Sequence, residues 1–213
     1  MLRSAAVAAA GTALVCYPRL AHAPALPYPL WYLEALLFLG GIVLWAFVFA
    51  WHTQYTHRPV FMQDIPPRTW AAATVAGLSV ALLLYFFQDP VLRGFAPDDY
   101  PATVEDWLAM TLFSLAFSQL FLVFAPFAWL MRLFRREWWA AALTVLFGAF
   151  VLVLKNYRSP APFSVALLLD VLLVRIVLGS FSVYFFLRGG LVLVWWWGLL
   201  LQSRHLLRFG TGF

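Results

Sequence analysis

The chain carries far fewer ionisable residues than a water-soluble protein of its length. Of its 213 residues only 11% are charged, whereas 64% are hydrophobic and 19% are aromatic. A soluble domain carries roughly 25% charged residues, and a chain of this size has no core large enough to hide so much apolar surface. The composition therefore excludes a water-soluble globular domain and predicts a protein of the lipid bilayer.

Cysteine and histidine are scarce as well. Cys16 is the only cysteine, so the chain forms no internal disulfide. Two of the four histidines, His52 and His57, lie five residues apart without a third ligand at similar spacing, which is not the pattern of a zinc site. We therefore expect no metal and no cofactor, and we interpret this pair as histidines of a hydrated loop at the membrane interface.

The basic residues do not form a cluster, although the net charge is +5. Nucleic-acid binding requires a basic face that follows the phosphates, whereas these arginines and one lysine are spread over short loops. Positive residues in such loops anchor helix ends against lipid headgroups. We expect the bilayer as the first partner and no nucleic acid.

What the chain has instead is a series of six long apolar runs. A membrane helix needs about 20 apolar residues to cross about 30 Å of hydrocarbon, and only a helix satisfies its own backbone groups there. We predict an all-α, polytopic integral membrane helix bundle in the inner (cytoplasmic) membrane of a bacterium, with one domain over residues 31–213. The predicted transmembrane helices are 31–51, 70–87, 107–131, 138–155, 162–186 and 189–207.

Residues 1–30 form a separate N-terminal segment in this prediction. An alanine-rich stretch follows Arg3, and Ala21-His22-Ala23 has the small-x-small form of a signal-peptide cleavage site. Pro18 and Arg19 interrupt the segment, which favours a short surface helix. Both alternatives, a cleaved signal and a surface helix, remain open.

Four polar residues within the predicted helices are the candidate site residues. Asp170 and Arg175 are ionisable, and such groups are costly inside a bilayer unless they are paired or hydrated. Because they point about 140° apart on one helix, we expect Asp170 to face a polar partner on another helix, with Gln119 and Ser118 as candidates. The group is either a substrate or proton site or an interhelical polar pair, and the lack of a second carboxylate favours the pair.

From residue 107 to 208 the order of features is similar to that of a known family. A long helix with Phe117-Ser118-Gln119-Leu120-Phe121 runs into the basic turn Arg135-Arg136, and the next helix begins at Trp138. Tyr184-x-x-Leu187-Arg188-Gly189-Gly190 then leads into a final helix. This order resembles the CPBP family of intramembrane proteases, which includes the CAAX prenyl-endopeptidase type.

The catalytic motifs of that family are absent from this chain. Its Glu-Glu-x-x-x-Arg, Phe-x-x-x-His and His-x-x-x-Asn/Asp motifs supply the carboxylate and the histidines that activate a water, with a metal, to cut a peptide bond. Ser118-Gln119 stands where the paired glutamates fall. Phe147 is followed four residues later by Val151, and Trp197 by Leu201, so neither histidine motif is present. We predict no catalytic residue, because neither a general base nor a set of metal ligands is left at these positions.

These features predict a non-catalytic membrane scaffold that binds a membrane protein or a peptide. Three alternatives remain open. One is an active intramembrane peptidase with a site rebuilt around Asp170 and the loop histidines, and another is an accessory subunit of a membrane complex. The last is a small transporter, which would need broken helices and polar groups at the midplane in both halves.

Overall fold

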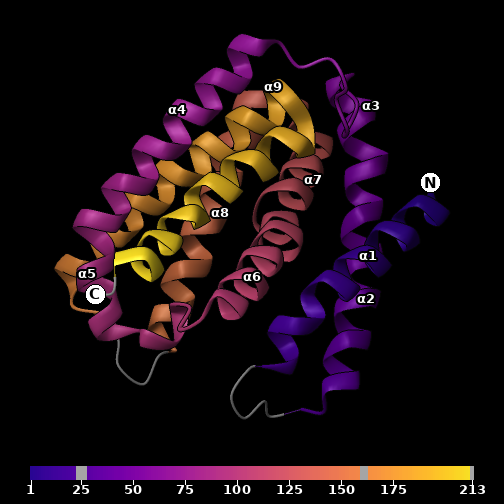
Figure 1. The fold of residues 1–213 in the computed structure, drawn as a ribbon. Helices are drawn as coiled ribbons and strands as arrows, with labels where there is room; N and C mark the ends of the chain where they lie inside the picture. Colours follow the sequence, from indigo (N-terminus) through magenta and orange to yellow (C-terminus); the bar gives the residue numbers. More distant parts are fainter. Residues whose placement is uncertain (23–27, 159–162, 212–213) are drawn as a thin grey trace.

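The protein is entirely helical over the residues that the structure describes. A computed structural model describes residues 1–22, 28–158 and 163–211, and no strand occurs among them (Figure 1). The predicted all-α class is thus confirmed. Six helical stretches are long and apolar enough to cross a membrane: Leu2–Ala21, Leu30–Thr56, Pro67–Phe95, Val104–Phe134, Glu137–Tyr157 and Val165–Phe209.

The six stretches differ from the six predicted runs at both ends of the chain. Leu2–Ala21, which was assigned to the signal-like or surface segment, is a 20-residue helix (α1) and one of the six. The last two predicted runs fall within a single stretch, α9 (Val165–Thr211), which is broken at Gly190. The predicted start at residue 162 lies outside the described residues.

Helix α1 packs along α2 (Leu30–Phe47) through small side chains. Ala5 and Ala9 are fully buried, and a Cβ placed on Gly41 of α2 would lie 3.2 Å from the Cβ of Ala9. The indole of Trp45 donates a hydrogen bond of 3.0 Å to the hydroxyl of Thr12. Small residues permit this close approach of two helices, so α1 belongs to the bundle. Ala23 of the expected cleavage site lies outside the described residues, and cleavage stays a prediction.

Three of the long helices contain π-helical turns. Helix α2 continues through η1 (Val48–His52) into α3 (Thr53–Thr56). Helix α4 (Pro67–Leu83) continues through η2 (Leu84–Gln88) into α5 (Asp89–Phe95). Helix α6 (Val104–Phe113) continues through η4 (Ser114–Ser118) and η5 (Leu120–Phe124) into α7 (Ala125–Phe134).

Prolines explain where two of these helices widen. Pro90 and Pro126 follow η2 and η5, respectively. A proline has no N–H group and its ring clashes with the carbonyl four residues earlier, so the preceding turn loses its regular bonds. A carbonyl in such a widened stretch is open to other donors: the indole of Trp195 donates to the carbonyl of Leu115 in η4 at 2.9 Å.

Two helix boundaries are set by local sequence, and the second of them, the basic turn, was predicted. Thr103 accepts a bond from the amide of Asp106, and the Asp106 carboxylate accepts one from the amide of Thr103, so a capping box begins α6. A short 3₁₀ turn, η3 (Pro97–Asp99), precedes it. The basic turn is also present, because α7 ends at Phe134, Arg135 is left-handed, and α8 (Glu137–Tyr157) follows.

The break in α9 is held by the loop between α3 and α4. Gly190 has φ 63° and ψ −157°, a conformation available almost only to glycine. The break frees the amide of Leu191 and the carbonyl of Leu187. The amide donates to the carbonyl of Val60 at 3.0 Å, and the guanidinium of Arg58 donates to the freed carbonyl at 3.2 Å. The loop therefore replaces the helical bond that the break removes.

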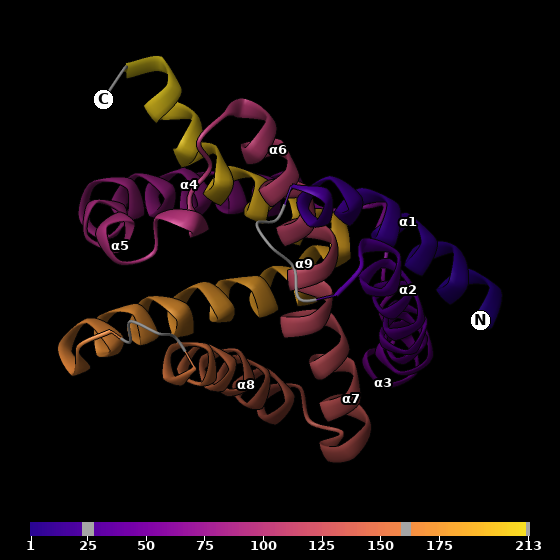
Figure 2. The ribbon, with the colours of Figure 1, turned by 90° about the horizontal axis from the view of Figure 1, so that it is seen from below.

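The break folds α9 into a helical hairpin at the centre of the bundle. Phe181 and Phe185 of its first half pack on Trp197 of its second half, with ring centroids 5.2 and 5.3 Å apart. The hairpin lies between α4 and α8, and α6–α7 separates it from the α1–α2 pair (Figures 1 and 2). The interior of the bundle is thus enclosed by helices on several sides.

Candidate functional site: a polar cavity inside the bundle

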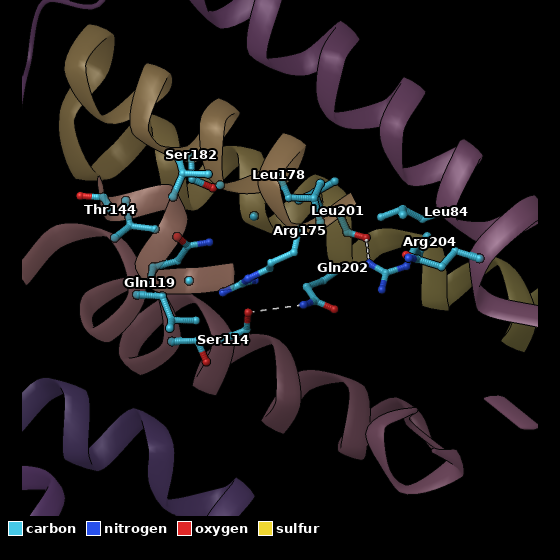
Figure 3. A pocket seen from close by; sticks show the side chains of 18 residues that line it. Leu84, Ser114, Gln119, Thr144, Arg175, Leu178, Ser182, Leu201, Gln202 and Arg204 are labelled. Atoms are coloured by element: carbon cyan, nitrogen blue, oxygen red, sulfur yellow. Dashed lines mark hydrogen bonds between the residues drawn. The ribbon is translucent and has the colours of Figure 1, made fainter. Parts of the chain in front are cut away.

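A cavity of about 220 Å³ lies between η2, the widened part of α6–α7, α8 and both halves of α9 (Figure 3). Eighteen residues line it, half of them polar. Those polar residues are Gln88, Ser114, Ser118, Gln119, Thr144, Arg175, Ser182, Gln202 and Arg204. A polar cavity of this size can hold several waters or one polar group of a ligand.

The local backbone explains why polar groups reach this cavity. Gln88, Ser114 and Ser118 come from the π turns, and π turns are frequent at functional sites. Helix α8 leaves room because it presents Gly148, whose position lacks a side chain. A Cβ placed there would lie 3.6 Å from Nε of Arg175, so the guanidinium rests against bare helix backbone.

Arg175 is the unpartnered charge of the cavity. It points from the first half of α9 towards the side where Ser114, Gln119 and Gln202 lie (Figure 3). No hydrogen bond or ion pair joins it to any residue that the structure describes. An arginine at the centre of a membrane helix costs about 2.5–3.5 kcal/mol on insertion scales, so its charge needs compensation from water or an anion.

A second polar atom of the cavity also lacks a partner. The Oε1 oxygen of Gln119 is buried and accepts no hydrogen bond within the described part of the chain. Nearby, Gln202 donates to the hydroxyl of Ser114 at 3.4 Å. Buried polar atoms are nearly always bonded in native structures, so the oxygen of Gln119 points to a donor from a ligand or water.

Arg204, in contrast, is paired with a carboxylate of its own protein. Its Nε donates to the carboxylate of Asp89 at 3.1 Å, and its Nη1 donates to the carbonyl of Leu201 at 2.7 Å. Asp89 is only 2% exposed and also accepts a bond of 3.1 Å from the hydroxyl of Tyr100. Burial raises the pKa of Tyr100, and the carboxylate of Asp89 raises it further, so this hydroxyl remains a donor at neutral pH.

A cleft of about 320 Å³ adjoins the cavity at the end of the bundle that holds Tyr100. The two share Ser114, Ser118, Gln202 and Arg204 as lining residues, and the cleft adds further cations, Arg19 and Lys155. Lys155 forms an exposed ion pair of 2.7 Å with Asp99. The cavity is therefore approached past basic side chains.

The structure brings three of the four predicted site residues together. Ser118, Gln119 and Arg175 all line the cavity. Asp170 does not: its side chain is exposed, and it makes no hydrogen bond or ion pair with a described residue. The expected contact of Asp170 with Gln119 or Ser118 is thus absent from the described part of the chain.

The Asp89–Arg204 pair was not predicted from the sequence. A usable signal was present, because each lies at the end of a run on the same side of the predicted bilayer and hence at a similar depth.

The interpretation of His52 as a residue of a hydrated loop is wrong. Its side chain is 0% exposed, and neither ring nitrogen has a partner among the described residues. The ring packs 4.4 Å from that of Phe186, because the helix runs on to Thr56 instead of ending at residue 51. His57 is exposed at the end of α3. No group of three potential metal ligands occurs among the residues described.

Comparisons with known proteins found no similar protein. No family model matches the chain, and searches of curated proteins and of solved structures find no match. The site offers hydrogen-bond donors and positive charge, but none of its eighteen lining residues carries a carboxylate, an imidazole or a thiol.

Proposed function

We propose that the chain is an integral membrane protein of the bacterial inner membrane whose cavity binds a polar group of a ligand without cleaving it. One observation carries the proposal: the cavity is lined by amides, hydroxyls and two arginines, with no carboxylate, imidazole or thiol among its lining residues. Activation of water by a general base or a metal needs such groups. Binding needs only the donors that are present.

A CPBP-like scaffold without protease activity is part of this proposal. Ser118 and Gln119, which stand where that family has its paired glutamates, lie in the cavity wall together with Leu201, which stands at the last position of the third motif. Phe147 and Val151, at the positions of the second motif, do not line the cavity. The convergence of positions from two of the three motifs supports the idea of a pseudoprotease. It does not depend on Asp170, which lies outside this wall.

The size of the cavity limits what it admits. Ordinary ligand sites measure roughly 300–1,000 Å³, and this cavity measures about 220 Å³. A membrane-protein or peptide partner would therefore insert one side chain, and a smaller ligand would insert one head group. The remainder of either partner would lie in the adjoining cleft.

A cavity-filling substitution tests the proposal. Gly148→Leu would place a side chain against Arg175, whereas Gly40→Leu, at an exposed position of α2 with nothing within 4 Å, is the matched control. Native mass spectrometry in an uncharged detergent should show a non-covalent occupant on the wild type and the control but not on Gly148→Leu. None of the three should cut membrane peptides. If the wild type does cut peptides, and if Ser118→Ala or Gln119→Ala abolishes that cleavage, the protein is a peptidase instead.

A small transporter is the second candidate function, because interrupted helices line the cavity from both halves of the chain. Gln88 comes from η2 and Ser118 from η4, and discontinuous helices are typical of transporter sites. A Ser118→Cys variant in a Cys16→Ala background separates the two functions. A binding protein should be labelled by impermeant thiol reagents from one side of the membrane only, whereas a transporter should be labelled from both.

A further inference from the structure

The two arginines of the cavity leave it with one uncompensated positive charge. Arg204 faces Asp89, whose carboxylate lies 3.1 Å away. The cavity around Arg175 is lined by amides, hydroxyls, glycines and apolar side chains, and no acidic residue is among the eighteen that line it. A ligand that enters this space therefore meets a net charge of one unit, which favours an anion.

We propose, building on the binding role assigned above, that the cavity binds the phosphate group of a phosphorylated ligand and that Arg175 is the residue that recognises it. An arginine fork donates two parallel hydrogen bonds to phosphate oxygens. Because no described residue occupies its donors, the guanidinium of Arg175 is free to make both bonds.

The other polar groups of the cavity fit a phosphate better than a carboxylate. Ser118 belongs to η4 and Ser182 to α9, so the hydroxyl donors come from different elements of the cavity wall. A phosphate offers three strong acceptor oxygens spread around one atom, whereas a carboxylate offers two in one plane. The unpaired Oε1 of Gln119 requires a donor, which a water or a hydroxyl held beside the phosphate would supply.

The approach to the cavity has the same sign of charge. The adjoining cleft shares Arg204 with the cavity and adds Arg19, Lys155 and one acid, Asp99, which pairs with Lys155. Its cations outnumber its acid, and it lies where α8 ends and α6 begins. Helix ends of a membrane protein lie at the level of the lipid headgroups. A phosphate could come from a phospholipid headgroup or from a soluble phosphate compound, and either would pass these cations before it reached Arg175.

Dihexanoyl phosphatidic acid, dihexanoylglycerol and inorganic phosphate are suitable probes, with the full chain in an uncharged detergent and native mass spectrometry as the readout. Wild type should bind the phosphatidic acid about tenfold or more tightly than the neutral lipid with the same chains. Competition by inorganic phosphate would identify phosphate alone as sufficient. Absence of competition would identify the lipid as the source, and phosphate recognition stands in both cases.

Variants of Arg175 decide the proposal. Arg175→Gln should remove the preference for phosphatidic acid, and Arg175→Lys should keep most of it. Arg132→Gln is the control, because Arg132 is exposed and lies over the ring of Trp51 in a different part of the bundle. Equal melting temperatures of the variants would show that they fold, as expected for a residue without a described partner.

Two results would overturn the inference, and only the second of them would also overturn the proposed binding function. If Arg175→Gln binds phosphatidic acid as the wild type does while Gly148→Leu loses both lipids, the cavity binds its ligand but does not recognise phosphate. If Gly148→Leu also binds both lipids as the wild type does, the proposed function fails as well.

Discussion

Arg175 and Arg204 lie on the two halves of one broken helix and line one cavity, yet their surroundings are opposite. Arg204 is held by a buried carboxylate and a backbone carbonyl. Arg175 has no described partner and rests against Gly148. Charges that stabilise a fold are paired, because an unpaired buried charge is strongly unfavourable. The difference indicates that Arg204 stabilises the fold and that Arg175 binds a ligand.

Removal of Arg204 should have the largest effect on stability. Arg204→Met would leave Asp89, 2% exposed, without its cation, and breaking such a buried pair costs about 3–5 kcal/mol. Unfolding by SDS in mixed micelles would measure the free energy. Arg132→Met, which removes an exposed arginine, should cost far less. Equal losses for the two variants would contradict a structural role of the Asp89–Arg204 pair.

Gly190→Ala should cost about 1–3 kcal/mol, because its left-handed backbone is strained for any other residue. The added Cβ would also overlap the carbonyl oxygen of Val60. This break is what sets the two arginine-bearing halves of α9 side by side. Gly40→Ala, at a helical position with open space around it, is the matched control and should leave the melting temperature unchanged or slightly higher. A neutral Gly190→Ala would show that the hairpin does not need this conformation.

Arg175→Met should have the opposite sign to Arg204→Met. Arg175 has no described partner, so the substitution removes an uncompensated charge. The free energy of unfolding should therefore stay the same or rise by up to about 2 kcal/mol. The same denaturation assay would measure it in the absence of phospholipid. A loss comparable to that of Arg204→Met would mean that Arg175 is a structural residue after all.

The smallest effect is expected at the exposed ion pair near the cleft. Lys155 and Asp99 are 67% and 53% exposed in their side chains, and such pairs contribute about 0–1 kcal/mol. Lys155→Met should therefore barely change the stability, and its effect should shrink further in high salt. A loss above about 2 kcal/mol would show that this pair stabilises the fold, as is expected of the Asp89–Arg204 pair.

Much of the fold could be predicted from the sequence, because apolar length and helix boundaries are local properties. The apolar runs and the capping box at Thr103 depend on neighbouring residues only, whereas the break at Gly190 also depends on bonds from Arg58 and Val60 in a distant loop. The α1 helix was missed as a candidate membrane span because its many alanines are only weakly hydrophobic. Its close packing on α2 through Ala9 and Gly41 is a tertiary property.

The site could be predicted only in part for the same reason. Ser118, Gln119 and Arg175 were found because a polar residue inside an apolar run is visible in the sequence. Asp170 was found by the same criterion but is exposed, since a run does not reveal which face of its helix meets the interior. The partner of Arg204 lies 115 residues away in the sequence, and no local pattern identifies such a pair.

The central claim is that Arg175 is a ligand-binding charge, and the melting temperatures of wild type and Arg175→Met test it most directly. Both would be measured in an uncharged detergent, with and without dihexanoyl phosphatidic acid. The claim predicts that Arg175→Met melts at or above the wild type without the lipid and that only the wild type is stabilised when the lipid is added. A variant that melts well below the wild type without the lipid, or that gains as much from the lipid, would contradict it.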